Sequence, residues 1–292
     1  MAQTPEPVSP PEQSTSSPAQ SPANRCPSSG TASPSAPPAF VYAVGQVEPR
    51  FPGLAAEKEF AQAMSRVDTA GQTDRQALRS VLDERAGRYL ARQICWVFTI
   101  EGLETYILVP RDPTDFDLLI EAVRPDPGRH DVDVVIGLRG SNAPPDRCNG
   151  LMVPIVAFDQ LYSFDRDTLI SAIPRPQDQP EDKFQATAAE LFDRIGQVAD
   201  NAGATDEHRA LNYLAVRYHA IYTRAAQSHA AEATLSEVEV RRSRLSGARN
   251  IVDVIFSYTH RRNDTTERYF VRVDVTEEFP FLVTKLSPFY ER

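Results

Sequence analysis

One cysteine stands in surroundings that favour nucleophilic chemistry. Cys148 lies in the turn Asp146-Arg147-Cys148-Asn149-Gly150, where the neighbouring guanidinium favours the thiolate form of a thiol. A thiolate nucleophile also needs a base within reach, and no histidine of this sequence stands in a partnering motif. Cysteine often serves as a small buried hydrophobe. Cys148 is therefore a candidate catalytic residue, and a half-buried structural thiol is the alternative.

The histidines show no metal-binding spacing. Zinc ligands usually come in pairs two to five residues apart, and this sequence has no such histidine pair. His208 and His219 share nearly one face of a predicted helix, but their eleven-residue spacing separates them by about 16 Å along its axis. We therefore predict no metal and no cofactor. His208 is the second candidate catalytic residue, and a boundary position beside the apolar stripe of that helix is the alternative.

Carboxylates and glycines near predicted strand ends offer weaker signals. Facing carboxylates can act as general acid and base, with solvated surface as the alternative. The segment Gly137-Leu-Arg-Gly140 lacks the glycine pattern and the Lys-Ser/Thr ending of a phosphate-binding loop, so it predicts a tight turn. The acidic residues near strand ends are Glu101, Glu104, Asp115 and Asp117.

Guanidinium groups are concentrated near one later strand. Arg241, Arg242 and Arg244 follow Glu239 and precede Arg249 in a chain whose formal net charge is -9. Such a cluster suits a carboxylate or a peptide partner. A charged strand edge that resists pairing with another chain is the alternative.

Composition narrows the class of protein. The 292 residues are 41% hydrophobic and 24% charged, which is typical of a globular protein, and the negative charge argues against nucleic-acid partners. Three widely spaced cysteines favour a reducing compartment over a disulfide scaffold. The segment MAQTPEPVSPPEQ lacks the features of a secretory signal, and no apolar run has the length of a membrane span. We expect a cytoplasmic protein with no membrane partner.

The chain divides into four segments by composition. Residues 1–39 are rich in proline and serine and predict a disordered arm. Residues 40–173 predict an N-terminal α+β subdomain, and the proline-rich stretch 174–182 predicts a linker. Residues 183–292 predict a helical hairpin followed by antiparallel strands.

The elements within these segments define the fold class. The predicted helices are 54–67, 73–93, 115–123, 167–172, 183–200 and 206–231. The predicted strands are 40–47, 94–100, 105–109, 131–138, 151–158, 235–240, 251–259, 267–275 and 281–286. Together they predict an α+β fold with mixed, largely antiparallel sheets and packed helices in two subdomains.

Five long strings resemble one known family. They closely resemble the C-terminal domain of PatG-type cyanobactin maturation proteins, from about residue 40 to the C-terminus. The strings are YAVGQVEPRFP (42–52), RYLARQICWVFTIEGLETYI (88–107), CNGLMVP (148–154), ADNAGATDEHRALNYLAVRY (199–218) and FVRVDVTEEFPFLVTKLSP (270–288).

The resemblance implies a role near peptide maturation. In PatG-type proteins this region follows a subtilisin-like domain that macrocyclises a ribosomal precursor peptide, and the region itself has no established reaction. No counterpart of the protease's Asp, His and Ser blocks occurs here, so no catalytic triad is transferred. The resemblance implies a stand-alone, non-catalytic accessory protein that binds a precursor peptide or pathway enzymes. The alternatives are a peptide-modifying enzyme using Cys148 or His208, and a homo-oligomer that organises other enzymes.

Overall fold

The computed structural model describes residues 39–177, 179–198 and 200–290. Contacts group residues Pro38–Arg292 as one compact unit. The predicted disordered arm, residues 1–39, lies outside the described residues apart from Ala39. The predicted boundary at 174–182 falls between two helices of the compact unit, and the division into two subdomains stays a prediction.

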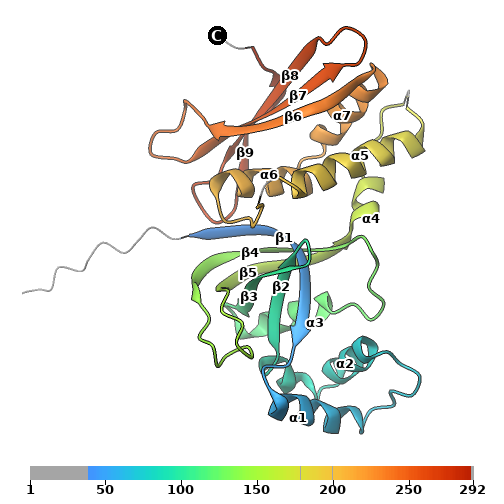
Figure 1. Cartoon of the computed structure of the whole chain (residues 1–292), viewed down its shortest axis with the longest axis vertical. Coiled ribbons are helices and arrows are strands. Elements are labelled where there is room, and N and C mark those ends of the chain that lie inside the picture. Colours follow the sequence, from blue (N-terminus) through green and yellow to red (C-terminus); the bar gives the residue numbers. More distant parts are fainter. Residues whose placement is uncertain (1–38, 178, 199, 291–292) are drawn as a thin grey trace, which may run out of the picture. The chain divides into compact units, whose positions relative to one another are not determined.

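A small closed barrel forms the first half of the fold. Its strand order is β1-β2-β3-β5-β4, and the barrel closes where β4 pairs with β1 (Figure 1). The β3–β5 pair is parallel and the other four pairs are antiparallel. The strands are β1 (Phe40–Arg50), β2 (Cys95–Ile100), β3 (Leu103–Pro110), β4 (Asp131–Asn142) and β5 (Pro154–Asp165).

Short helices complete the barrel core. Trp96, Phe98 and Phe158 are fully buried in the interior beside Phe60 of α1 and Leu82 of α2. A capping box at Thr73 begins α2, as the Thr-Asp pair in the sequence predicts. The elements are α1 (Leu54–Met64), α2 (Asp74–Asp83), η1 (Arg88–Arg92), η2 (Pro113–Asp115), α3 (Phe116–Ala122) and α4 (Arg166–Ser171).

The second half places helices against a four-stranded antiparallel sheet. Helices α5 and α6 lie between the barrel strand β1 and this sheet, whose order is β6-β7-β8-β9 (Figure 1). Val44 and Val132 of the barrel pack against the core of this half, so the apolar contacts are continuous. The elements are α5 (Glu181–Gly196), α6 (Asp206–Arg217), α7 (Ala220–Ala230), β6 (Ala233–Arg242), β7 (Ile251–His260), β8 (Thr266–Asp274) and β9 (Phe281–Pro288).

The predicted α+β fold class is confirmed, and three local predictions are wrong. The helix predicted over 73–93 ends at Asp83, where the backbone of Glu84 becomes extended, and the separate 3-10 helix η1 follows. The helix predicted over 206–231 breaks at Tyr218, whose backbone leaves the helical region and whose hydroxyl accepts a hydrogen bond from the Leu286 amide at 2.9 Å. The tight turn predicted at 137–140 is part of β4 instead. A Cβ at Gly137 would lie 2.4 Å from the Ala157 carbonyl oxygen of β5, so glycine allows the two strands to approach.

The loop between α5 and α6 attaches this layer to the barrel. The Tyr42 amide of β1 donates to the Gly203 carbonyl at 2.9 Å, and the Tyr106 hydroxyl donates to the Ala202 carbonyl at 2.8 Å. Gly203 has φ +69°, and a Cβ there would lie 2.3 Å from the Tyr42 carbonyl oxygen. Glycine is therefore required by both the backbone angle and the close approach.

Candidate functional site

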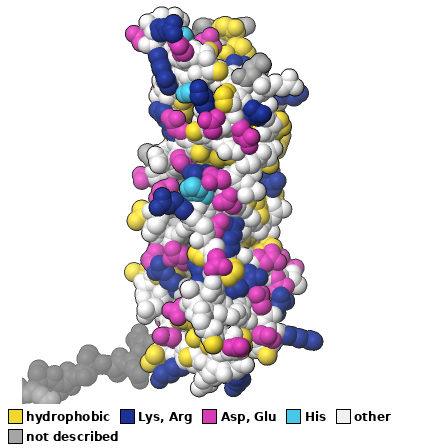
Figure 2. Space-filling view, turned by 90° about the vertical axis from the view of Figure 1, so that its right-hand side faces the viewer, with side chains coloured by type: hydrophobic (Ala, Val, Ile, Leu, Met, Phe, Trp, Pro, Cys, Tyr) yellow, Lys and Arg dark blue, Asp and Glu magenta, His cyan; other side chains and the backbone are white. Residues whose placement is uncertain are grey.

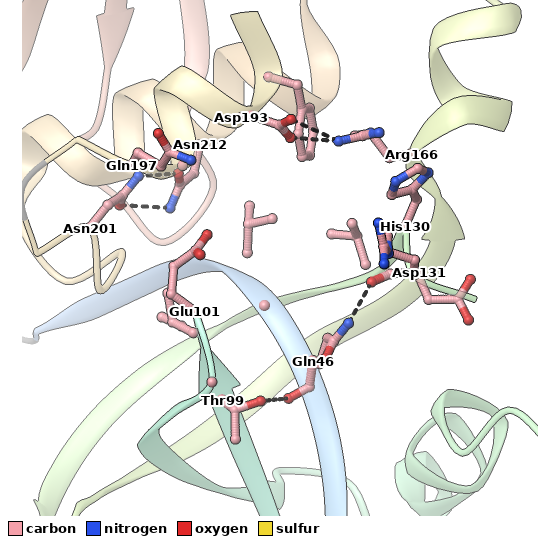
Figure 3. A pocket seen from close by; sticks show the side chains of 18 residues that line it. Gln46, Thr99, Glu101, His130, Asp131, Arg166, Asp193, Gln197, Asn201 and Asn212 are labelled. Carbon is pink, nitrogen blue, oxygen red and sulfur yellow. Dashed lines mark hydrogen bonds and ion pairs between the residues drawn. The ribbon is translucent and has the colours of Figure 1, made fainter. Parts of the chain in front are cut away.

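A polar pocket of about 420 Å³ lies where the barrel meets α5 and α6 (Figure 3). The strand β1 crosses its floor, with β2 on one side and β4 on the other. Gln46 of β1 connects the two sides, because its carbonyl accepts from the Thr99 hydroxyl at 3.4 Å and its side-chain amide donates to the Asp131 carbonyl at 3.0 Å. Val44 and Val132 add apolar surface to the lining.

Two buried asparagines hold one wall of the pocket. The side-chain amide of Asn212 donates to the Tyr42 carbonyl at 2.8 Å and to the Asn201 side-chain oxygen at 3.1 Å. Asn201 returns a bond to the Asn212 side-chain oxygen at 2.7 Å and donates to the Ile195 carbonyl at 3.2 Å. Buried amides with satisfied donors fix local geometry, so this pair makes the wall rigid.

Ion pairs organise the opposite side. Arg166 makes a two-point contact with Asp193 of α5, at 2.7 and 2.9 Å, and His130 contacts Asp167 at 2.7 Å through Nδ1. Burial alone would raise the pKa of Asp167, but hydrogen bonds from His130 and Arg166 outweigh it, and the pKa lies below its usual value. In Figure 3, His130 and Arg166 stand across the cavity from Glu101 and Asn201.

Two charged side chains that line the pocket do not take part in these ion pairs. Within the described residues, neither Glu101 nor Arg129 forms an ion pair or a side-chain hydrogen bond, and both side chains belong to exposed residues that line the pocket. Glu101 occupies the β2–β3 turn with φ 50°, and Arg129 immediately precedes the β4 side of the pocket. The pocket is therefore dipolar, with a carboxylate beside one neighbour of β1 and a guanidinium beside the other.

The strand order sets the scale of this dipole. Neighbouring strands are about 4.8 Å apart, so β2 and β4 are separated by roughly 10 Å across β1. Thr99 pairs with Gln46 and Asp133 pairs with Gly45, so Glu101 and Arg129 lie beyond these pairs in opposite directions along β1. The span between the two charges is therefore longer than the strand spacing, and at about 3.3–3.6 Å per residue it requires an extended ligand of more than about three residues. A ligand with a cationic group at one end and an anionic group at the other fits this arrangement.

The two candidate catalytic residues from the sequence lie elsewhere. Cys148 is bonded to Cys95 in a disulfide with a Cα–Cα distance of 5.8 Å, and His208 is in the first turn of α6, where its amide donates to the Thr205 hydroxyl at 3.2 Å. Neither residue lines the pocket. The expectation of reduced cysteines is wrong for Cys95 and Cys148 in this structure, because the β4–β5 loop returns Cys148 to the start of β2.

Of the four acidic residues noted near strand ends, only Glu101 lines the pocket. Glu104 pairs with Arg50, and Asp117 pairs with Arg88 at 3.0 Å. These two carboxylates are therefore surface charges, which was the alternative that the sequence left open. The sequence did not mark Arg129 or Arg166 as site residues. Arg129 stands in a loop just before β4, and Arg166 directly follows β5, and neither lies in a recognisable motif. Within the described residues, no group of three or more His, Cys, Asp or Glu side chains is arranged to hold a metal ion.

A second cluster of charges joins the barrel to the β8–β9 loop. Arg111 contacts Glu278 at 3.3 Å and also pairs with Asp159 of β5. Burial and the neighbouring Asp159 carboxyl raise the pKa of Glu278 from its ordinary 4.5 to about 7, against the opposing effect of Arg111 and Arg209. The carboxyl pair is therefore most favourable when it carries one proton.

This carboxyl pair predicts a pH dependence of stability. Because the folded-state pKa of Glu278 is raised, its contribution is fully present below about pH 4.5 and is lost as pH rises through about 7. Solvent screens the pair in part, so we expect the melting temperature to fall by roughly 2–4 °C between pH 5 and pH 8. Thermal unfolding of the wild type and of Glu278→Gln at both pH values measures the contribution of Glu278. The melting temperature of the variant should not fall between pH 5 and pH 8.

The exposed neighbour provides the control for this measurement. Glu277→Gln removes the same charge one residue away, from an exposed position, and should keep the wild-type pH dependence. An equal fall in melting temperature for Glu278→Gln and the wild type would show that other groups cause it.

Acidic and basic side chains alternate over the face shown in Figure 2, which presents no broad patch of one sign. Among the described residues, no helix combines the length and apolarity needed to cross a membrane. The barrel, its interposed helices and the open four-stranded sheet define a two-part α+β architecture with a polar pocket at the junction.

Comparison with known proteins identifies this class. Residues 178–289 match the family described as PatG C-terminal. A solved structure titled "PatG Domain of Unknown Function" has the same fold, with a TM-score of 0.70 and 20% identity, over 86% of this chain and 98% of that one. No curated protein matches the chain. The resemblance seen in the sequence strings is confirmed.

Proposed function

We propose that this protein is a non-catalytic accessory protein of ribosomal peptide maturation that binds a short peptide in the pocket beneath α5. The observation that carries the proposal is the unpaired carboxylate of Glu101 facing the basic side of a polar cavity. The peptide's amino group would contact Glu101 and its carboxylate would contact Arg129. The match of residues 178–289 to the PatG C-terminal family supports the link to precursor peptides and pathway enzymes as partners.

The lining suits a peptide backbone between those two ends. Gln46 and Gln197 place side-chain amides along the cavity, and the Glu101–Gly102 turn adds backbone polar groups. Val44, Val132 and Phe192 supply apolar surface for a side chain. A few polar groups set among apolar ones are typical of sites that fix the orientation of a small ligand.

Neutral variants of the two end groups test the binding mode. Each of Glu101→Gln and Arg129→Gln should weaken binding of a linear hexapeptide about tenfold, the loss of one charge-assisted contact at an exposed position. Isothermal titration calorimetry measures the affinities. Glu121→Gln and Arg85→Gln change the same residue types at exposed positions outside the pocket and should bind as the wild type does.

Peptide mass separates the accessory role from the enzymatic alternative. Wild-type protein incubated with a precursor peptide should return that peptide at unchanged mass, while binding is still detected. A mass change that disappears in His208→Ala or Cys148→Ala would establish an enzyme and overturn the non-catalytic role. Self-association is a separate alternative, and sedimentation of the purified chain tests it.

A further inference from the structure

The second sheet has one covered face and one open face. Val254 of β7 and Val271 of β8 point to the helices and are fully buried in their core. Their strand neighbours Asp253 and Arg272 are paired with each other in the register and therefore point to the opposite side. Within the described residues, no helix packs against that opposite side.

The open face holds a groove of about 600 Å³ lined by arginines and aromatic rings. Arg241 lies over the ring of Phe289 at 5.0 Å, and Arg272 lies over the ring of Phe270 at 4.8 Å. The two rings meet edge to face with centroids 5.7 Å apart. Stacking on aromatic rings orients a guanidinium and leaves its in-plane N–H groups available to an acceptor.

The groove is positive in an otherwise acidic protein. Arg241, Arg242, Arg244 and Arg272 line it together with a single carboxylate, that of Asp253. Asp253 is bonded to Arg272 at 2.9 Å and is 5% exposed, so it neutralises only one of the four arginines. Glu239 of the same strand contacts Arg241 at 3.6 Å, whereas Arg244 forms no ion pair within the described residues. Arg242 pairs with Val252, a residue of the helix-side core, so it belongs to the other face of the sheet at the rim of the groove.

An exposed aromatic completes the groove. Tyr290 is 80% exposed although it lines the same cavity, and the chain direction of β9 carries Phe289 and Tyr290 along the open face. Large exposed aromatics beside arginines are the residue types that dominate protein-binding hot spots. A single charged ion would leave these rings unused, whereas a peptide segment would cover them.

We propose that this arginine-aromatic groove, formed by Arg241, Arg244, Arg272, Phe289 and Tyr290, docks an extended acidic segment of a partner protein. Aspartate and glutamate carboxylates of that segment accept hydrogen bonds from the arginines, and its apolar side chains cover the two rings. The site lies on the open face of the second sheet and does not depend on the pocket at the barrel, so either site can fail without the other.

Fluorescence anisotropy with a labelled nine-residue peptide of alternating Glu and Val tests the proposal. The full-length wild type should bind it, and binding should weaken as salt increases because the contacts are charged. A peptide with Gln in place of Glu should bind at least tenfold more weakly. Absence of binding by the wild type at low salt would overturn the proposal.

Two double variants that each remove two positive charges distinguish binding in the groove from general electrostatic attraction of the acidic peptide. Arg241→Gln/Arg244→Gln should weaken binding at least tenfold, whereas Arg85→Gln/Arg261→Gln removes two exposed arginines elsewhere and should change it less than twofold. Equal losses in the two double variants would contradict docking in the groove. Tighter binding of a phosphorylated oligonucleotide than of the acidic peptide would also overturn it, because it would identify a different class of partner.

Discussion

Replacing Gly203 with alanine should destabilise the protein by about 3 kcal/mol or more. The backbone there has φ +69°, where an L side chain costs about 1–2 kcal/mol, and overpacking adds about 1–3 kcal/mol. The new Cβ would meet the Tyr42 carbonyl oxygen at 2.3 Å, and this atom belongs to the backbone of β1 and cannot rotate away. Chemical denaturation measures the free energy of unfolding.

A second glycine separates the two contributions. Gly71 has φ +76°, and a Cβ there would have no atom within 4 Å. Gly71→Ala should therefore cost only the backbone term, about 1–2 kcal/mol. The Gly203 variant should also lose pocket binding in its folded form, because the Asn212 bond to the Tyr42 carbonyl positions one wall. Equal destabilisation by the two alanines would contradict the close approach between the loop and β1.

Removing the Cys95–Cys148 disulfide should destabilise the protein by about 4 kcal/mol or more. The bond closes a sequence separation of 53 residues, and the chain-entropy relation gives about 4 kcal/mol for a loop of that length. Cys148 lies 6% exposed in a small apolar cluster with Ile107 and Ala143, so its loss also disturbs the packing of the β4–β5 loop. Cys95→Ala/Cys148→Ala is the variant to compare by denaturation.

A reductant distinguishes the bond from the packing. Dithiothreitol should lower the denaturation midpoint of the wild type and leave that of the double alanine variant unchanged. Both cysteines are 6% exposed, so reduction of the folded wild type should be slow. A wild-type midpoint that does not respond to prolonged reduction would show that the two sulfurs are not bonded.

Much of the fold follows from local sequence signals. Alternating valines predicted β4, and the capping residues Thr73 and Thr205 marked helix starts that the structure reproduces. Tyr218 broke a predicted helix because its hydroxyl bonds the amide of Leu286, 68 residues away. Barrel closure likewise depends on β4 returning to β1, a pairing that periodicity does not encode.

The pocket was harder to predict than the fold. Glu101 had a sequence signal, since it stands in a turn between two strands. The other residues of the pocket, however, include Gln46, 55 residues earlier in the chain, and Asn212, 111 residues later. Arg129 resembles any solvated arginine until the β2-β1-β4 order places it across from Glu101. The arginine cluster at 241–244 was visible in the sequence, but the rings that orient it come from Phe270 and Phe289.

The most direct test of the proposed peptide site is calorimetric titration of the wild type with one hexapeptide in four forms. These are the free zwitterion, the N-acetylated form, the C-amidated form and the doubly capped form. We expect the zwitterion to bind best and the doubly capped peptide to bind weakest. N-acetylation alone or C-amidation alone should each weaken binding about tenfold, because each removes one terminal charge. Equal affinity for the zwitterion and the doubly capped peptide, or no binding of any form, would contradict a dipolar peptide site between Glu101 and Arg129.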